Sequence, residues 1–374
     1  MSVAQYPLPF TKNYIRHWGI VEAIRELFQN QLDSDSPFEY SIDMAEDRSL
    51  TLSLTSRNIT LSPKTLLLGA TTKAEAKDKI GSFGEGYKMA LLVLTRENRK
   101  VTVKNGDYIW TPEFVHSHQY DDEILVINSE LAPERNDGIT YVIENIDSSE
   151  MDQIKQSNLH MEPNIGEIIE TSKGRILLDQ KGKLYVNGLF VCKTELKYSY
   201  DMKPEYLRLE RDRQTVSSFD LQWLTKDMWF ETDRHEQMAK DMEDGIADLE
   251  YGHHGSPQMV KEACYQYFIQ KNPGAIAVSN QEELDKLVKD GMTNTVYVGG
   301  GSYYNNISGA KEYASSSIKS PDPLKPVDIM EAFIAKHKHR LGNKAVKDFN
   351  KILEESKEWQ RGRGQTYKPF PFNK

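Results

Sequence analysis

The chain has 374 residues and a formal net charge of −9 at pH 7, with 38% hydrophobic and 28% charged residues. This composition is typical of a soluble globular protein with two or three domains. It excludes a membrane-spanning protein, because no apolar run approaches the roughly 20 residues that cross a bilayer. Two cysteines, Cys192 and Cys264, exclude a disulfide framework, and the amino terminus lacks a signal peptide. We therefore expect a cytoplasmic protein without membrane contact.

The first informative element is a helix predicted around residues 20–34. Its apolar residues recur at helical spacing and form one stripe: Ile20, Val21, Ile24, Leu27 and Phe28. Glu26, Asn30 and Asp33 follow at i, i+4 and i+7 and form a second stripe. Such oxygen ligands hold a hydrated divalent cation or position a water for attack on a phosphate. The alternative is an ordinary solvated polar face.

Two further elements follow within the first hundred residues. Leu50, Leu52 and Leu54 alternate and predict a strand, whose register continues to Ser56. Residues 80–90 are rich in glycine and lead into an apolar helical run over 89–94. Glycines let a backbone approach a ligand closely, and amides at the start of a helix favour anions. Turns and caps also use glycine, so the second element alone is a weak signal.

Taken together, these stretches resemble the GHKL ATPases, which include gyrase B subunits, large heat-shock chaperones, sensor histidine kinases and MutL-type repair proteins. Residues 26–34 match the family's first box, Glu-Leu-x-x-Asn-x-x-Asp-(Ala/Ser), and residues 80–86 match its glycine box, Ile-Gly-x-Phe-Gly-x-Gly. Residues 138–140, Gly-Ile-Thr, resemble the family strand whose threonine contacts the nucleotide. The resemblance covers roughly residues 10–150.

One family element is altered. The family has a strand that ends in Asp-x-Gly-x-Gly, and its aspartate accepts a hydrogen bond from the adenine amino group. Here Ser56 stands at the aspartate position, with Asn58 and Thr60 at the glycine positions. A neutral serine makes a weaker hydrogen bond than a carboxylate, so this departure puts adenine selectivity and high affinity in doubt.

The resemblance implies a site for ATP and Mg²⁺. Glu26 would be the general base, steadied by Arg25, while Asn30 would bind Mg²⁺ and Asp33 would support the site through water. The remaining residues assigned to the nucleotide are Ser56, Gly81, Phe83, Gly84, Gly86, Lys88 and Thr140. The glycines would form a lid around the phosphates, and Lys88 would add positive charge.

The implied fold is a Bergerat-type two-layer α/β sandwich, a mixed sheet plus helices, over residues 1–160. A smaller α/β transducer-like domain is expected over 161–270, and a βαβ-like unit with C-terminal helices over 271–358. A flexible basic tail is expected over 359–374.

Within the second domain, residues 175–191 predict strands around a Lys181-Gly182 turn, and Asn187-Gly188 is a hairpin signal that divides the second run again. In many family members this domain lends a lysine or arginine to the γ-phosphate. Candidates by position are Lys193, Arg211 and Arg213. A surface salt-bridge cluster is the alternative for each of them.

The region after residue 272 predicts a short βαβ unit. It comprises a strand over 274–278, a helix opened by a capping box at Ser279 to Glu282, and a strand over 295–298. The following residues 299–302, Gly-Gly-Gly-Ser, predict a turn into a mobile loop rather than a phosphate site.

The C-terminal stretch 335–374 is basic, with eleven Lys/Arg against four Asp/Glu. It suggests contact with nucleic acid, an acidic partner or another part of the chain, whereas a solvated helix with a loose end is the simpler alternative. Helical spacing predicts an amphipathic helix through the apolar residues Val346, Phe349, Ile352 and Leu353.

These patterns lead to two functional hypotheses. The first is an ATP-binding protein with slow Mg²⁺-dependent hydrolysis that drives lid closure, with an unknown protein partner or a nucleotide-dependent homodimer. The alternative is a degenerate GHKL scaffold that binds protein or nucleic acid without turning over ATP. Scattered histidines and the absence of a Gly-x-Ser-x-Gly elbow give other chemistries little support.

Overall fold

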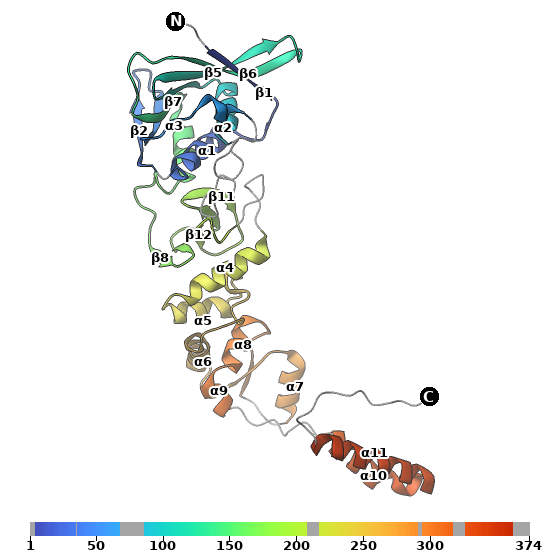
Figure 1. The fold of residues 1–374 in the computed structure, drawn as a ribbon. Helices are drawn as coiled ribbons and strands as arrows, with labels where there is room; N and C mark the ends of the chain where they lie inside the picture. The colour runs from blue at the N-terminus through green and yellow to red at the C-terminus, as the bar shows by residue number, and fades with distance from the viewer. Residues whose placement is uncertain are drawn as a thin grey trace. The chain divides into compact units, whose positions relative to one another are not determined.

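The computed structural model describes residues 4–34, 36–67, 86–207, 217–290, 294–316 and 326–361. It divides into two compact units, Met1–Ala310 and Lys311–Lys374. Figure 1 shows the elements of both units along the chain.

A seven-stranded sheet forms the first layer of the larger unit, in the order β1-β6-β5-β4-β7-β3-β2. Its strands are β1 Ala4–Thr11, β2 Phe38–Met44, β3 Leu50–Arg57, β4 Lys100–Asn105, β5 Tyr108–Ser117, β6 Asp122–Leu131 and β7 Gly138–Ile146. Every neighbouring pair in this sheet is antiparallel. The expected α/β sandwich is confirmed, but this sheet is not mixed, because short hairpin connections between β4, β5 and β6 require antiparallel neighbours.

Three helices, α1 Ile20–Leu32, α2 Gly86–Arg96 and α3 Ser148–Gln156, form the second layer on one face of this sheet (Figure 1). The apolar stripe of α1 packs with α2 against strand residues such as Leu52, Leu54 and Val103 in one core. Burying each such side chain contributes about 1.5–3 kcal/mol, so this stripe fixes which face of α1 turns inward.

A second sheet of five strands follows in the order β11-β10-β12-β9-β8. Its strands are β8 Ile168–Thr171, β9 Gly174–Leu177, β10 Lys183–Val186, β11 Leu189–Lys193 and β12 Ser199–Met202. This sheet is mixed, since β10 runs parallel to β12. The predicted division at Asn187-Gly188 is confirmed: both residues have positive φ, 50° and 79°, as a two-residue hairpin between β10 and β11 requires.

Helices α4 Ser218–Phe230, α5 His235–Glu243 and α6 Gln258–Lys271 come next, with a 3-10 turn over Ala247–Leu249. A buried polar network ties them to β12. The Asp248 carboxylate accepts hydrogen bonds from the Lys197 amide at 2.7 Å, the Tyr198 amide at 3.2 Å and the Tyr200 hydroxyl at 2.5 Å. The Trp229 indole donates to the same Tyr200 hydroxyl at 2.9 Å. Buried polar groups are costly when they lack hydrogen-bond partners, so this network favours one arrangement of the helices against β12.

The predicted βαβ unit is present as β13 Ile276–Val278, α7 Gln281–Lys289 and β14 Thr295–Tyr297, and its two strands are parallel. The cap lies one residue later than expected. Asn280, not Ser279, is the N-cap, and its side chain accepts from the Glu283 amide at 2.8 Å.

The expected loop after residue 302 was wrong, because helix α8 Ser302–Ser308 occupies this segment. Tyr303, Asn306 and Ile307 are buried at helical spacing. The sequence of this segment predicted a loop because it is rich in Ser, Tyr and Asn, which are common in loops, and the helical spacing of its buried residues was therefore not recognised.

The smaller unit contains α9 Lys311–Ser316, α10 Pro326–His337 and α11 Asn343–Arg361, with a 3-10 turn over Lys338–Arg340 between the last two. The Phe333 and Phe349 rings stack with centroids 5.6 Å apart, and Leu353 is buried. The amphipathic C-terminal helix is therefore confirmed as one arm of a helical hairpin. Among the residues that the structure describes, no helix is both long and apolar enough to cross a membrane.

Candidate functional site

Helix α1 carries the first box into the interior of the larger unit. The Glu26 side chain is fully buried, and Asp33, which caps the C-terminal end of α1, is 4% exposed. Asn30 lies one turn after Glu26, and its amide nitrogen donates to the Glu26 carbonyl oxygen at 2.7 Å. The alternative of a solvated polar face does not hold for Glu26 and Asp33, because both side chains are buried.

Arg25 stands beside Glu26 and links α1 to the second sheet. Its Nη2 lies 3.6 Å from Glu26 Oε1, and its Nη1 donates to the Phe190 carbonyl oxygen of β11 at 3.3 Å. Arg25 is itself 9% exposed. The guanidinium therefore contacts both the carboxylate and the following domain, which suits a residue that orients Glu26.

Helix α2 brings a buried cation to the same face of the sheet. Gly86 begins this helix, and Lys88 in its first turn is fully buried. The Lys88 ammonium donates to the Leu67 carbonyl oxygen at 2.5 Å and lies 5.7 Å from the centre of the Tyr87 ring. Burial raises the pKa of Tyr87 to about 12, so its hydroxyl stays neutral and donates to Thr65. The other residues of the glycine box, Gly81, Phe83 and Gly84, lie outside the described residues.

Ser56 lies on the helix-covered face of β3, as the alternation of the strand predicts. It is fully buried, and its hydroxyl donates to the Gln31 side-chain oxygen of α1 and lies 3.5 Å from the Ser34 hydroxyl. Gln31 is also buried, and its amide nitrogen has no hydrogen-bond partner among the residues that the structure describes. The position that the resemblance assigns to adenine recognition is thus already contacted by Gln31.

Thr140 lies on the opposite face of the sheet from Ser56. Ser56 pairs with Ile139 across the β3–β7 ladder, whereas Thr140 pairs with Thr55, and the two hydroxyls are 3.0 Å apart. Successive strand residues point to opposite faces, so the structure does not bring Thr140 to α1. The Gly-Ile-Thr motif specifies residue types, but it does not specify the register in which β7 pairs with β3. That register determines the face of the sheet on which the Thr140 side chain lies.

Sequence reasoning missed Gln31. The sequence feature that could have indicated its role is that Gln31 is a polar residue between Leu27 and Leu32 on a helix that is buried on several sides. Only the side-chain bond to Ser56, a residue 25 positions away, shows its role.

The structure does not bring the second-domain candidates for the γ-phosphate contact to the site. Lys193 ends β11 and is exposed, while Arg211 and Arg213 lie outside the described residues. Across residues 4–361, leaving aside the undescribed segments, no group of three or more His, Cys, Asp or Glu side chains is arranged to hold a metal ion.

Comparison with known proteins gives little further information. No family model matches the chain. The chain is similar to an uncharacterized protein of Mycoplasma pneumoniae, with 26% identity over 220 residues, which cover 55% of this chain and 89% of that protein. This relative is distant and has no assigned activity. The function of the chain is therefore inferred from the site.

Proposed function

We propose that this chain is a GHKL-type protein that binds Mg²⁺-ATP and hydrolyses it slowly to drive a conformational switch. One observation carries the proposal: Glu26 on α1 and Lys88 on α2 are both fully buried; α1 carries the first box, and α2 begins at the last glycine of the glycine-rich box. Taking an ionised group out of water costs several kcal/mol, which pairing and hydrogen bonds offset only in part. Buried charges beside two matching boxes are therefore best explained by a phosphate site.

The residues at this site fit Mg²⁺-ATP in part. The Asn30 carbonyl oxygen is a ligand type that Mg²⁺ uses, and Lys88 would offset phosphate charge. Bound Mg²⁺-ATP would supply the phosphoanhydride bond and the cation that neutralises its oxygens. Glu26 would take the proton of the attacking water, and Arg25, 3.6 Å away, would hold that carboxylate in position.

Two observations support the competing proposal of a degenerate scaffold without turnover. Gln31 already contacts Ser56, and Thr140 lies on the far face of the sheet. Phosphate release from Mg²⁺-ATP by the full chain separates the proposals: slow release that depends on Mg²⁺ supports the ATPase, and its absence supports the scaffold. As part of the ATPase proposal, we also propose that the protein is cytoplasmic and forms a homodimer when nucleotide binds.

Substitution of Ser56 by Asp is expected to raise the ATP-to-GTP affinity ratio about tenfold, because a carboxylate accepts more strongly than a hydroxyl from the adenine amino group and repels guanine's carbonyl oxygen. Titration of both nucleotides into both forms measures this ratio. Thr55→Asp is the matched control, since Thr55 precedes Ser56 but lies on the opposite face of β3. A ratio that does not change in Ser56→Asp rejects the assignment of Ser56.

A second candidate function, binding of nucleic acid, is favoured by the charge of the helical hairpin. Exposed basic side chains gather around its turn and along the first turns of α11, where Asp348 is the one acidic residue among them; Glu354 and Glu355 lie further along. The basic residues are Lys336, Lys338, Arg340, Lys344, Lys347 and Lys351. Such a group suits a phosphate backbone, for which the attraction is electrostatic and independent of base sequence.

The hairpin variant with Lys338, Arg340, Lys344 and Lys347 all changed to Gln is expected to lose most of its affinity for duplex DNA. Fluorescence anisotropy at several salt concentrations measures this, and the slope of log K against log salt should fall by about 0.9 for each lost phosphate contact. The control is the pair Lys286→Gln and Lys289→Gln on α7, which lies in the larger unit. Equal slopes in parent and hairpin variant would reject this surface.

A further inference from the structure

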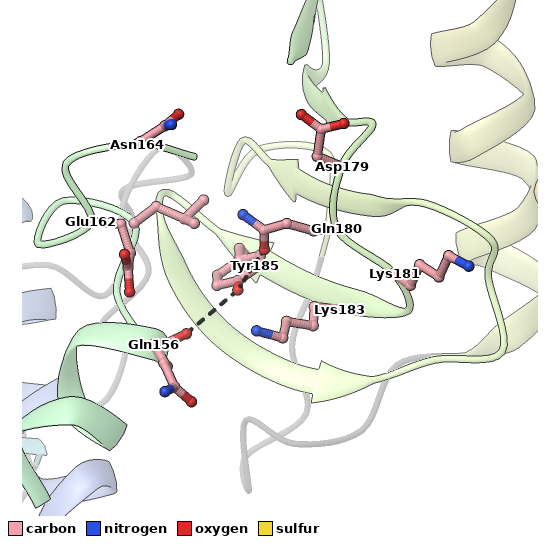
Figure 2. Close-up of a pocket in the computed structure, with 9 residues that line it drawn as sticks. Gln156, Glu162, Asn164, Asp179, Gln180, Lys181, Lys183 and Tyr185 are labelled. Atoms are coloured by element: carbon pink, nitrogen blue, oxygen red, sulfur yellow. Dashed lines mark hydrogen bonds between the residues drawn. The ribbon is translucent and has the colours of Figure 1, made fainter. Parts of the chain in front are cut away.

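A pocket of about 330 Å³ lies between the segment that follows α3 and the turn from β9 to β10 (Figure 2). It is lined by Gln156, Leu159, Glu162, Asn164, Asp179, Gln180, Lys181, Lys183 and Tyr185. None of these residues belongs to the proposed ATP site. Leu159 is the single aliphatic residue among the nine, and four of the others are charged.

Two opposite charges stand on different walls of this pocket. Glu162 belongs to the segment after α3, and Lys183 begins β10; their charged ends both face the space above Gln156 in Figure 2. Neither side chain makes an ion pair or side-chain hydrogen bond within the described part of the chain. Both side chains are therefore available to a ligand in the pocket, and a molecule that carries both charges could pair with each of them.

The other charged lining residues do not compete for such a ligand. Asp179 accepts a hydrogen bond from the Glu167 amide at 2.7 Å and so holds the segment before β8. Lys181 is exposed at the turn, and in Figure 2 its ammonium points away from Glu162.

Tyr185 gives the pocket a fixed and neutral wall. Its side chain is buried, and its hydroxyl lies 3.2 Å from the Gln180 side-chain oxygen and 3.5 Å from the Gln156 carbonyl oxygen. Burial, helped by Glu162, raises the pKa of Tyr185 to about 12, so the hydroxyl keeps its proton at neutral pH. A volume of about 330 Å³ lies within the range of pockets that hold small molecules.

We propose that this pocket binds a small zwitterion of the α-amino-acid class, with its ammonium at Glu162 and its carboxylate at Lys183. Both lining charges are then neutralised by one molecule, through charge-assisted hydrogen bonds. A ligand with one charge would leave either Glu162 or Lys183 without a partner, and an apolar ligand would leave both without one. The ligand contacts α3 at Gln156 and β10 at Tyr185, so it ties the helical layer of the first sheet to the second sheet.

The test is isothermal titration of the full chain with each of the common amino acids at millimolar concentration, repeated with acetate and with methylamine alone. At least one amino acid should bind, and both single-charge probes should bind more weakly. Glu162→Gln and Lys183→Gln should each weaken that amino acid about tenfold or more. Glu195→Gln, at an exposed position after the same sheet but outside the pocket, should bind as the parent does.

The double variant Glu162→Lys with Lys183→Glu separates a binding role from damage to the fold. It restores both charges with their places exchanged, and it should recover affinity that either single change loses. The proposal is overturned if no amino acid binds at millimolar concentration, if acetate binds as tightly as the amino acid, or if the two Gln variants bind as the parent does. None of these results depends on ATP binding.

Discussion

Substitution of Glu26 by Gln is expected to lower the rate of ATP hydrolysis by about 10²–10⁴-fold while leaving nucleotide binding largely intact. The carboxylate would act on the attacking water, so its loss is felt in the transition state more than in the ground state. Glutamine keeps the volume of the fully buried side chain and leaves no cavity. Phosphate release at saturating Mg²⁺-ATP and a parallel binding titration measure the two effects separately.

Glu22→Gln is the matched control for that variant. Glu22 lies one turn earlier on α1, and its carboxylate accepts from the Gly19 amide at 2.8 Å, a bond that a glutamine oxygen can keep. The control should hydrolyse ATP at the parental rate. If Glu26→Gln does so too, Glu26 is not the base.

Truncation of Asp248 to Ala is expected to lower the free energy of unfolding by about 3–5 kcal/mol, since it leaves several buried donors without an acceptor. These donors are the amides of Lys197 and Tyr198 and the hydroxyl of Tyr200. Urea unfolding monitored by tryptophan fluorescence measures the loss, because Trp229 belongs to the same network. The exposed Asp233, changed to Ala, should alter stability by less than about 0.5 kcal/mol. An equal, small effect at both positions would show that the network contributes little.

The same carboxylate makes stability depend on pH. Burial raises the pKa of Asp248 above its ordinary value of 3.8, although its hydrogen bonds lower it in part. A carboxyl whose folded pKa is raised stabilises the fold when protonated, and this contribution is lost as the pH rises from 3.8 through the folded pKa. In that interval the parent should lose stability relative to Asp248→Asn as pH rises. The opposite slope would show that the hydrogen bonds, and not burial, dominate the pKa of Asp248.

Local patterns in the sequence predicted the elements that position the site. The apolar stripe from Ile20 to Phe28 gave α1, and the alternation of Leu50, Leu52 and Leu54 gave β3 together with the inward direction of Ser56. These predictions succeed because periodicity records which face of an element is buried.

Contacts between distant segments could not be predicted in this way. The register that sets Thr140 opposite Thr55, and the contact of Gln31 with Ser56, each join residues far apart in the chain. The pairing of β1 with β6, and of β7 with β3 and β4, is equally non-local, and the resemblance implied a mixed sheet. Burial of Lys88 also depends on packing that a sequence pattern does not show.

Calorimetric titration of the full chain with Mg²⁺-ATP tests the proposed nucleotide site most directly. We expect saturable binding of one ATP per chain. We also expect affinity to fall on chelation of Mg²⁺, and in Asn30→Ala, which removes an oxygen ligand from α1. Addition of chelator should then have little further effect on that variant. No binding of ATP at millimolar concentration, with or without Mg²⁺, would contradict the proposed function and leave the buried charges of α1 and α2 on a scaffold that does not bind nucleotide.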